Sequence, residues 1–137
     1  MKISTRLRCG LRLLARLAQA FGKGTPLKAR DVAEAEHLSP DYLRQIAAML
    51  EAQGIVQSIR GKDGGYILAK PPEEVTLLEV VQALEGPIHP VECLVNPSFC
   101  SFVTSCSTKK IWEDTAACLT GFFATKTLKN LVEEERG

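Results

Sequence analysis

Three cysteines within fourteen residues are the feature of the sequence with the clearest chemical meaning. Cys93, Cys100 and Cys106 are separated by six and five residues, whereas structural zinc ligands usually come in close Cys-x2-Cys pairs and ferredoxin cysteines follow other spacings. Iron–sulfur clusters favour thiolate ligands, and a flexible loop can bring three thiols around one cluster. The triad therefore favours an iron–sulfur cluster, while a structural zinc site, redox-active thiols and unpaired buried cysteines stay open as alternatives.

The chain has five cysteines in all, and an odd number is more typical of metal ligands or reactive thiols than of a disulfide framework in an intracellular protein. The triad supplies three ligands and leaves a fourth position weak or exchangeable, which suits a sensor better than a structural site. His37 and His89 are isolated in the sequence, without a nucleophile–base pair. We therefore do not expect an enzyme.

The cysteines fall in the one long segment without a periodic pattern. Residues 87–106 contain three prolines and follow a helix that opens with a capping box at residues 76–79. Apolar residues at helical spacing then predict a long helix over residues 107–123, and a short helix follows it. A loop of this length is usually functional or disordered, so we expect it to carry the cluster.

The first half of the chain has the order of a winged helix-turn-helix. Apolar spacing predicts helices over residues 3–21 and 28–36, and a third helix begins at Ser39, a good N-cap, and Pro40, a good first residue. Within residues 55–68, side chains suited to the two faces of a strand alternate on either side of a glycine-rich turn, which predicts a β-hairpin. The predicted fold is mainly α with a small β-hairpin wing, a winged helix-turn-helix followed by a long dimerisation helix.

The length of 137 residues suits one domain with an appended dimerisation element. No stretch is apolar for long enough to span a bilayer, and no signal peptide is visible, so we expect a cytoplasmic protein without a membrane partner. The expected regions are a DNA-binding region at 1–70, a connecting helix at 71–86, the cysteine loop at 87–106, and the dimerisation and C-terminal helices at 107–137.

The charges are unevenly distributed along the chain. Residues 1–70 hold 12 Lys/Arg against 6 Asp/Glu, and residues 71–137 hold 5 against 10. A basic first half suggests contact with a polyanion, although a solvated dipolar surface would give the same counts. Together with the winged-helix order, this charge favours double-stranded DNA as the partner.

The third helix and the hairpin supply the predicted DNA contacts. The N-terminal residues of a recognition helix meet base edges in the major groove, and Arg60 at the hairpin tip can enter the minor groove. Lys62 and three cations of the first helix are predicted to contact phosphates. The complete predicted set is Ser39, Asp41, Tyr42, Arg44, Gln45, Arg60, Lys62, Arg8, Arg12 and Lys2.

Over nearly its whole length the chain resembles the IscR/NsrR-type family of winged-helix regulators. The specific parts of the resemblance are RGKDGGY at residues 60–66 and the cysteine triad, supported by MKISTRLRCGLRLL, LSPDYLRQI, TLLEVVQALEG and IWEDTAACLTGFFATKTLKNLV. The resemblance implies a homodimer on a pseudo-palindromic operator. It also implies a cluster whose state alters DNA binding in response to iron, redox or nitric-oxide status.

The chain departs from the family at the fourth cluster ligand. The family's cluster-assembly regulators use a histidine three residues after the last cysteine, where this chain has Lys109, a poor ligand. Its nitric-oxide sensors use an acidic residue on the partner's first helix, where this chain has Arg8. The neighbouring Cys9, contributed by the partner subunit, is then the best protein candidate for the fourth ligand. One residue along a helix turns the side chain by about 100°, which is a geometric objection to it.

Other residues could fill the fourth position, and the cluster can be 2Fe–2S or 4Fe–4S. Cys118 is a weaker rival because it lies three turns into the dimerisation helix, and His89, Glu92, water or a small thiol stay in reserve. Arg44 is a further departure, because the cluster-assembly regulators carry there an acidic residue that discriminates between operators. The operator sequence of the cluster-assembly regulators is therefore not expected to be the operator of this protein.

Two other functions compete with an iron–sulfur regulator. A regulator without a cluster would sense through thiol oxidation or another metal, as some family members lack a cluster. A small iron–sulfur electron carrier ranks lower, because it would leave the LSPDYLRQI helix and the RGKDGGY hairpin without a purpose.

Overall fold

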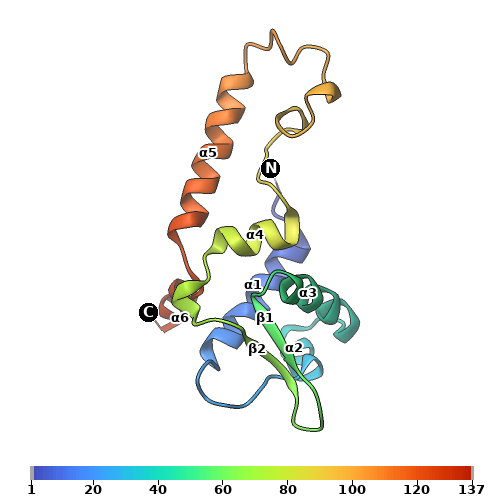
Figure 1. Cartoon of the computed structure of the whole chain (residues 1–137), viewed down its shortest axis with the longest axis vertical. Coiled ribbons are helices and arrows are strands. Elements are labelled where there is room, and N and C mark those ends of the chain that lie inside the picture. The colour runs from blue at the N-terminus through green and yellow to red at the C-terminus, as the bar shows by residue number, and fades with distance from the viewer. Residues whose placement is uncertain (1, 137) are drawn as a thin grey trace.

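The computed structural model describes residues 2–136 of the chain, and its elements follow one another in the order of a winged helix with a helical extension (Figure 1). The elements are α1 (Thr5–Gln19), α2 (Ala29–Glu36), α3 (Pro40–Ala52), β1 (Val56–Ile59), β2 (Gly65–Leu68), α4 (Leu77–Glu85), α5 (Lys109–Thr125) and α6 (Leu128–Arg136). Short 3₁₀ turns lie at Pro72–Glu74, Glu92–Leu94 and Pro97–Phe99. The predicted fold class is confirmed.

Local capping sets the helix starts that the sequence predicts. The hydroxyl of Ser39 accepts a hydrogen bond from the backbone N–H of Tyr42, and Thr76 does the same for Glu79 at the start of α4. Both side chains satisfy a backbone donor that the first turn of a helix leaves without a partner. His37 ends α2 with a φ of 57°, the left-handed conformation that turns the chain into α3.

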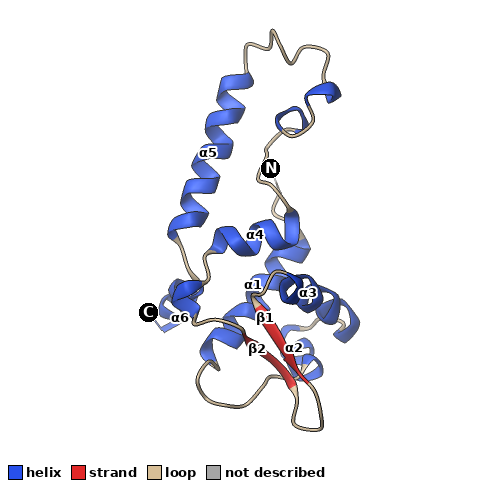
Figure 2. Cartoon of the chain, viewed as in Figure 1, coloured by secondary structure: helices blue, strands red, loops and turns tan. Residues whose placement is uncertain are grey.

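The two strands form an antiparallel hairpin, the only strands in the described part of the chain (Figure 2). Val56 pairs with Leu68 and Ile59 pairs with Gly65, so residues 60–64 form the turn. Tyr66 also exchanges two backbone hydrogen bonds with Leu27, at 3.0 and 2.7 Å. The hairpin is thereby attached to the segment just before α2.

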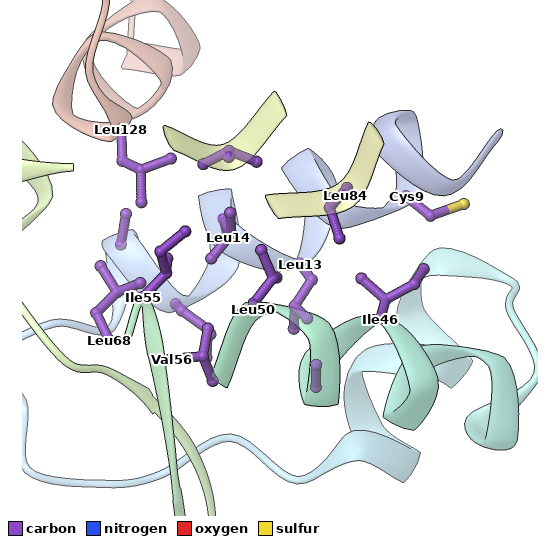
Figure 3. Packing of buried hydrophobic residues seen from close by; sticks show 14 of the residues in the cluster. Cys9, Leu13, Leu14, Ile46, Leu50, Ile55, Val56, Leu68, Leu84 and Leu128 are labelled. Atoms are coloured by element: carbon purple, nitrogen blue, oxygen red, sulfur yellow. The ribbon is translucent and has the colours of Figure 1, made fainter. Parts of the chain in front are cut away.

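The core is built around α1. Leu13 and Leu14 have no exposed surface, and Leu17 is 2% exposed. They lie among buried side chains of α3, α4, α6 and the hairpin, several of which Figure 3 shows together. At Gly10 an added Cβ would lie 2.4 Å from Cδ1 of Leu84, so the missing side chain lets α1 and α4 approach closely.

The C-terminal half extends away from this core and then returns to it (Figure 1). In the described residues no side chain of α5 is buried, whereas Leu128 of α6 is fully buried. Backbone hydrogen bonds from Leu77 to Lys126 and from Leu128 to Val75 fix α6 beside the start of α4. The sequence predicted a long helix over residues 107–123, and α5 begins and ends two residues later, with Thr108 as an N-cap whose side chain makes no capping hydrogen bond.

None of the described helices is long and apolar enough to cross a membrane.

One carboxylate ties α2 to α1. Glu36, whose side chain is 11% exposed, accepts hydrogen bonds from the guanidinium groups of Arg12 and Arg16. Partial burial alone would raise the pKa of Glu36, but the hydrogen bonds and charges of Arg16 and then Arg12 outweigh it and hold the pKa below its usual value of 4.5. The recognition helix α3 follows α2 directly, so this tie helps to fix its position.

We expect Glu36→Gln to lower the free energy of unfolding by about 1 kcal/mol at neutral pH, because a neutral amide keeps only part of the attraction of the two guanidinium groups. Because folding lowers the pKa of Glu36, its contribution is present above the pKa of the unfolded chain and is lost as the pH falls through the folded-state value. The difference in melting temperature between the two proteins should therefore shrink below about pH 4.5. A difference that stays constant down to pH 3 would contradict this account.

Candidate nucleic-acid interface and cysteine loop

The exposed face of α3 carries polar side chains at its N-terminal end. Gln45 and Ser39 are exposed, and Nη1 of Arg44 lies 2.9 Å from Oδ1 of Asp41. Tyr42 is half-buried and packs against the core. Gln45 is therefore free to meet a partner, whereas Arg44 is paired with Asp41 and Tyr42 is partly occupied within the domain.

The tip of the wing presents two cations on a glycine-rich turn. Arg60 and Lys62 are both exposed, and Gly61 between them has a φ of 109°, which disfavours any residue with a side chain. The N–H of Gly64 donates to the carbonyl of Gly61 and closes the turn. Both side chains thus lie at the tip of the wing, as the sequence predicted.

A hollow of about 380 Å³ lies between the wing, α3 and the start of α2, and cations from all three segments line it. Arg44 comes from α3 and Lys62 from the wing, while Lys28 and Arg30 come from the start of α2. None of the residues that line this hollow is acidic. Lys28 and Arg30 were absent from the predicted contacts, because only the tertiary fold brings the start of α2 beside the wing.

The three cations predicted on and before α1 lie elsewhere. Lys2 lines a different hollow, of about 790 Å³, between the N-terminal segment, α4 and α5. Arg8 is exposed on α1, and Arg12 is engaged with Glu36. The structure does not place these three in the hollow with the wing, and contact with DNA phosphates stays a prediction for each of them.

The cysteine loop connects α4 to α5 along the extended end of the molecule. Cys93, Cys100 and Cys106 are half-buried free thiols, the first within one 3₁₀ turn and the second just after another. Among the described residues no three His, Cys, Asp or Glu side chains are placed to hold a metal ion. In this single chain the thiols share one loop without converging on one point.

Cys106 has a polar environment at the end of the loop. Its Sγ lies 3.2 Å from the hydroxyl of Thr108. Hydrogen bonds with the side chain and then the backbone of Thr108 lower the pKa of the Cys106 thiol, and the nearby charge of Lys109 acts in the same direction. A thiolate is the form of cysteine that binds metals and reacts with oxidants.

The candidates for a fourth ligand lie in different places. Cys9 is 4% exposed and belongs to the core, next to Ile46 and Leu84 in Figure 3, while Cys118 is exposed on α5. Nδ1 of His89 lies 2.9 Å from the carbonyl oxygen of Pro87, to which its protonated form donates, and Nε2 lies 3.5 Å from Glu92. The position of Cys9 supports the interpretation that it is a small core residue, and ligation in trans stays a prediction.

The loop and α5 expose large apolar side chains. Phe99 and Phe102, on either side of Cys100, are each 69% exposed, and Ile111 and Phe122 of α5 are 58% and 54% exposed. Apolar surface of this extent on neighbouring segments is typical of an interaction surface.

Comparison with known proteins identifies the family. The profile of the Rrf2 family, described as "Iron-dependent Transcriptional regulator", matches residues 3–134. The transcriptional regulator CymR of Bacillus subtilis is 44% identical over 94 residues, covering 69% of this chain and 67% of CymR.

Two solved structures are similar over nearly the whole chain. The structure described as CymR, "the Global Cysteine Regulator of B. subtilis", has a TM-score of 0.80 and 32% identity, covering 98% of both chains. The structure described as "T. potens IscR" has a TM-score of 0.80 and 30% identity, covering 98% of this chain and 88% of that one. All these relatives are regulators and not enzymes, and the protein belongs to the Rrf2 family of winged-helix, DNA-binding transcriptional regulators.

Proposed function

We propose that this regulator binds a pseudo-palindromic operator as a homodimer and senses iron, redox or nitric-oxide status through an iron–sulfur cluster. The observation that carries the DNA-binding part is the set of cations that α3, the wing and the start of α2 contribute to one hollow whose lining has no acidic residue. Such a surface attracts the phosphate backbone, while Gln45 and Arg44 can address base edges from the major groove. The proposal also places the protein in the cytoplasm, where its operator is.

The homodimer rests on α5. This helix has no buried side chain in the described structure, although Ile111, Trp112, Leu119 and Phe122 give it an apolar character. An apolar helix is stable in water when a partner covers its face, and a second copy related by two-fold symmetry offers the same face in return. Two recognition helices related by that symmetry would match two half-sites of an operator.

The donor set of the loop fits an iron–sulfur cluster. Cys93, Cys100 and Cys106 are free and half-buried, on short turns that pack little against the core. We propose that these three side chains hold the cluster in the dimer, where its iron atoms would supply a centre that oxidants and nitric oxide alter. The exposed rings of Phe99 and Phe102 can exclude water from the thiols once a partner covers the loop.

A direct path connects the loop to the DNA-binding elements. Glu85 is the last residue of α4 before the loop, and its carboxylate accepts a hydrogen bond from Ser4, the N-cap of α1. Nη2 of Arg6 lies 3.6 Å from the same carboxylate. Through α1, which packs against α3, a rearrangement of the loop can change the position of the recognition helix.

A second candidate function is a regulator that senses through thiol chemistry without iron. One finding favours it: a similar structure carries the description of a cysteine regulator. The absorption spectrum and iron content of anaerobically isolated protein separate the two functions, because a coloured, iron-containing protein excludes the cluster-free one.

We expect Arg60→Ala to weaken binding to a specific duplex by about 1–3 kcal/mol, because the arginine reads a base edge or the shape of the minor groove. Fluorescence anisotropy at fixed salt measures this on a duplex that the wild type selects from a random pool and on a scrambled duplex of equal length. The matched control is Lys129→Ala, an exposed cation on α6. An equal loss on both duplexes would show that Arg60 contacts phosphates only.

We expect Cys93→Ala, Cys100→Ala and Cys106→Ala each to abolish or strongly destabilise the cluster, because each removes one thiolate. Circular dichroism should show an unchanged fold, since none of the three belongs to the core. The control is Ser101→Ala, which changes an exposed side chain of the same loop and removes no thiol. Full iron content in any triad variant removes that residue from the ligand set.

For the fourth position, we propose Cys9 in trans, and Cys9→Ala tests it. If Cys9 is a ligand, this variant loses iron and its cluster spectrum changes. The thiol is also buried in the core of its own subunit, so we expect a lower melting temperature from the small cavity in either case. An unchanged cluster spectrum and iron content would remove Cys9 from the ligand set.

A further inference from the structure

We propose that Lys28 and Arg30 form, with Lys62 of the wing, a cradle for the phosphodiester backbone of DNA between the recognition helix and the wing. This inference rests on the proposed function and adds the start of α2 to the interface. In this role the residues contact DNA phosphates, which fixes the register of the protein on the duplex without reading the base sequence.

The first support is the convergence of charge. The hollow of about 380 Å³ is lined by Lys28, Arg30, Arg44 and Lys62, which three separate segments contribute. Asp41 is paired with Arg44 at 2.9 Å and partly neutralises it, and Asp63 and Asp31 are not among the lining residues. The cations left for an anion are therefore Lys28, Arg30 and Lys62, which form no ion pair among the described residues. An anion in this hollow therefore meets cations on several sides.

The second support is that the walls of the hollow are fixed relative to one another. Tyr66 of β2 and Leu27, the residue before Lys28, exchange backbone hydrogen bonds at 2.7 and 3.0 Å. At Gly65 an added Cβ would lie 2.4 Å from the carbonyl oxygen of Leu27. The wing therefore touches the α2 start directly, and the spacing of Lys28 and Lys62 is held by backbone contacts. A preorganised pair of cations loses less freedom on binding an anion.

The third support is that Lys28 is a poor residue for the place it occupies. It is the N-cap of α2, and no side chain satisfies the first backbone N–H groups of this helix. Ser39 and Thr76 cap α3 and α4 by their hydroxyls, whereas a lysine can accept no hydrogen bond and brings positive charge to the positive end of the helix. Only Asp31 in the first turn offsets this charge. A DNA phosphate beside Lys28 would balance this positive charge and would explain why a lysine stands at the start of α2.

The test uses the full-length wild-type protein and the variants Lys28→Ala and Arg30→Ala. Affinity is measured against salt concentration on a duplex that the wild type selects from a random pool and on a scrambled duplex. We expect each variant to lose roughly 3- to 10-fold in affinity on both duplexes alike, as for one solvent-exposed hydrogen bond of ordinary net strength. The slope of log K against log salt should fall by about 1 for each variant. The control is Lys23→Ala, an exposed lysine of the α1–α2 loop outside the hollow.

A second variant separates DNA binding from folding. Lys28→Ser supplies a capping hydroxyl, so we expect its melting temperature to rise by roughly 2–4 °C while its affinity for both duplexes falls as in Lys28→Ala. Unchanged salt slopes for Lys28→Ala and Arg30→Ala overturn the cradle while the proposed function stands. If Lys23→Ala lowers affinity and salt slope as much as Lys28→Ala and Arg30→Ala do, the cradle is also overturned, because the positive charge then acts without a specific site. If the wild type binds no duplex, the proposed function itself fails.

Discussion

The packing of α1 is the constraint on which the rest of the structure depends. Its leucines at 13, 14 and 17 are almost completely buried, and α1 contacts α2, α3, α4, α6 and the hairpin strand β2. Close-packed side chains tolerate little displacement, so elements that share one core move together or repack in discrete steps. The recognition helix and the helix that precedes the cysteine loop are both packed against α1, which makes this helix the mechanical link between the two ends of the molecule.

A second set of contacts fixes the DNA-facing elements relative to one another. The carboxylate of Glu51 in α3 accepts hydrogen bonds from the backbone N–H and the hydroxyl of Ser58 in β1, and these bonds lower the pKa of Glu51. On the other side of the hairpin, Tyr66 is paired with Leu27. The wing is thus attached to α3 through one strand and to the segment before α2 through the other. A surface that must match a duplex needs such fixed spacing more than it needs high local stability.

Local chemistry explains which parts of this molecule could be predicted from sequence. The Ser39–Pro40 start of α3, the capping box at Thr76 and the glycine-rich hairpin turn each depend on residues within a few positions, and each is present. The partner of Arg12 could not be predicted in this way, because Glu36 lies on another helix. The same holds for Lys28, whose position beside the wing depends on long-range backbone pairing. Among the described residues, no contact brings the three thiols of the triad together, so their spacing in sequence did not predict their arrangement.

The two ends of the chain differ in how tightly their side chains are packed. The DNA-binding end is packed and hydrogen-bonded so that its cations keep their spacing, and the side chains of the buried cluster lie in it, in α4 and α6, and at Val75 just before α4. The cysteine loop has no buried side chain in the described structure and exposes two phenylalanines beside Cys100. A segment with so little packing of its own has several conformations close in free energy, so ligand binding or oxidation can select among them. The Glu85 contacts with Ser4 and Arg6 then lie where such a change would first reach the rigid core.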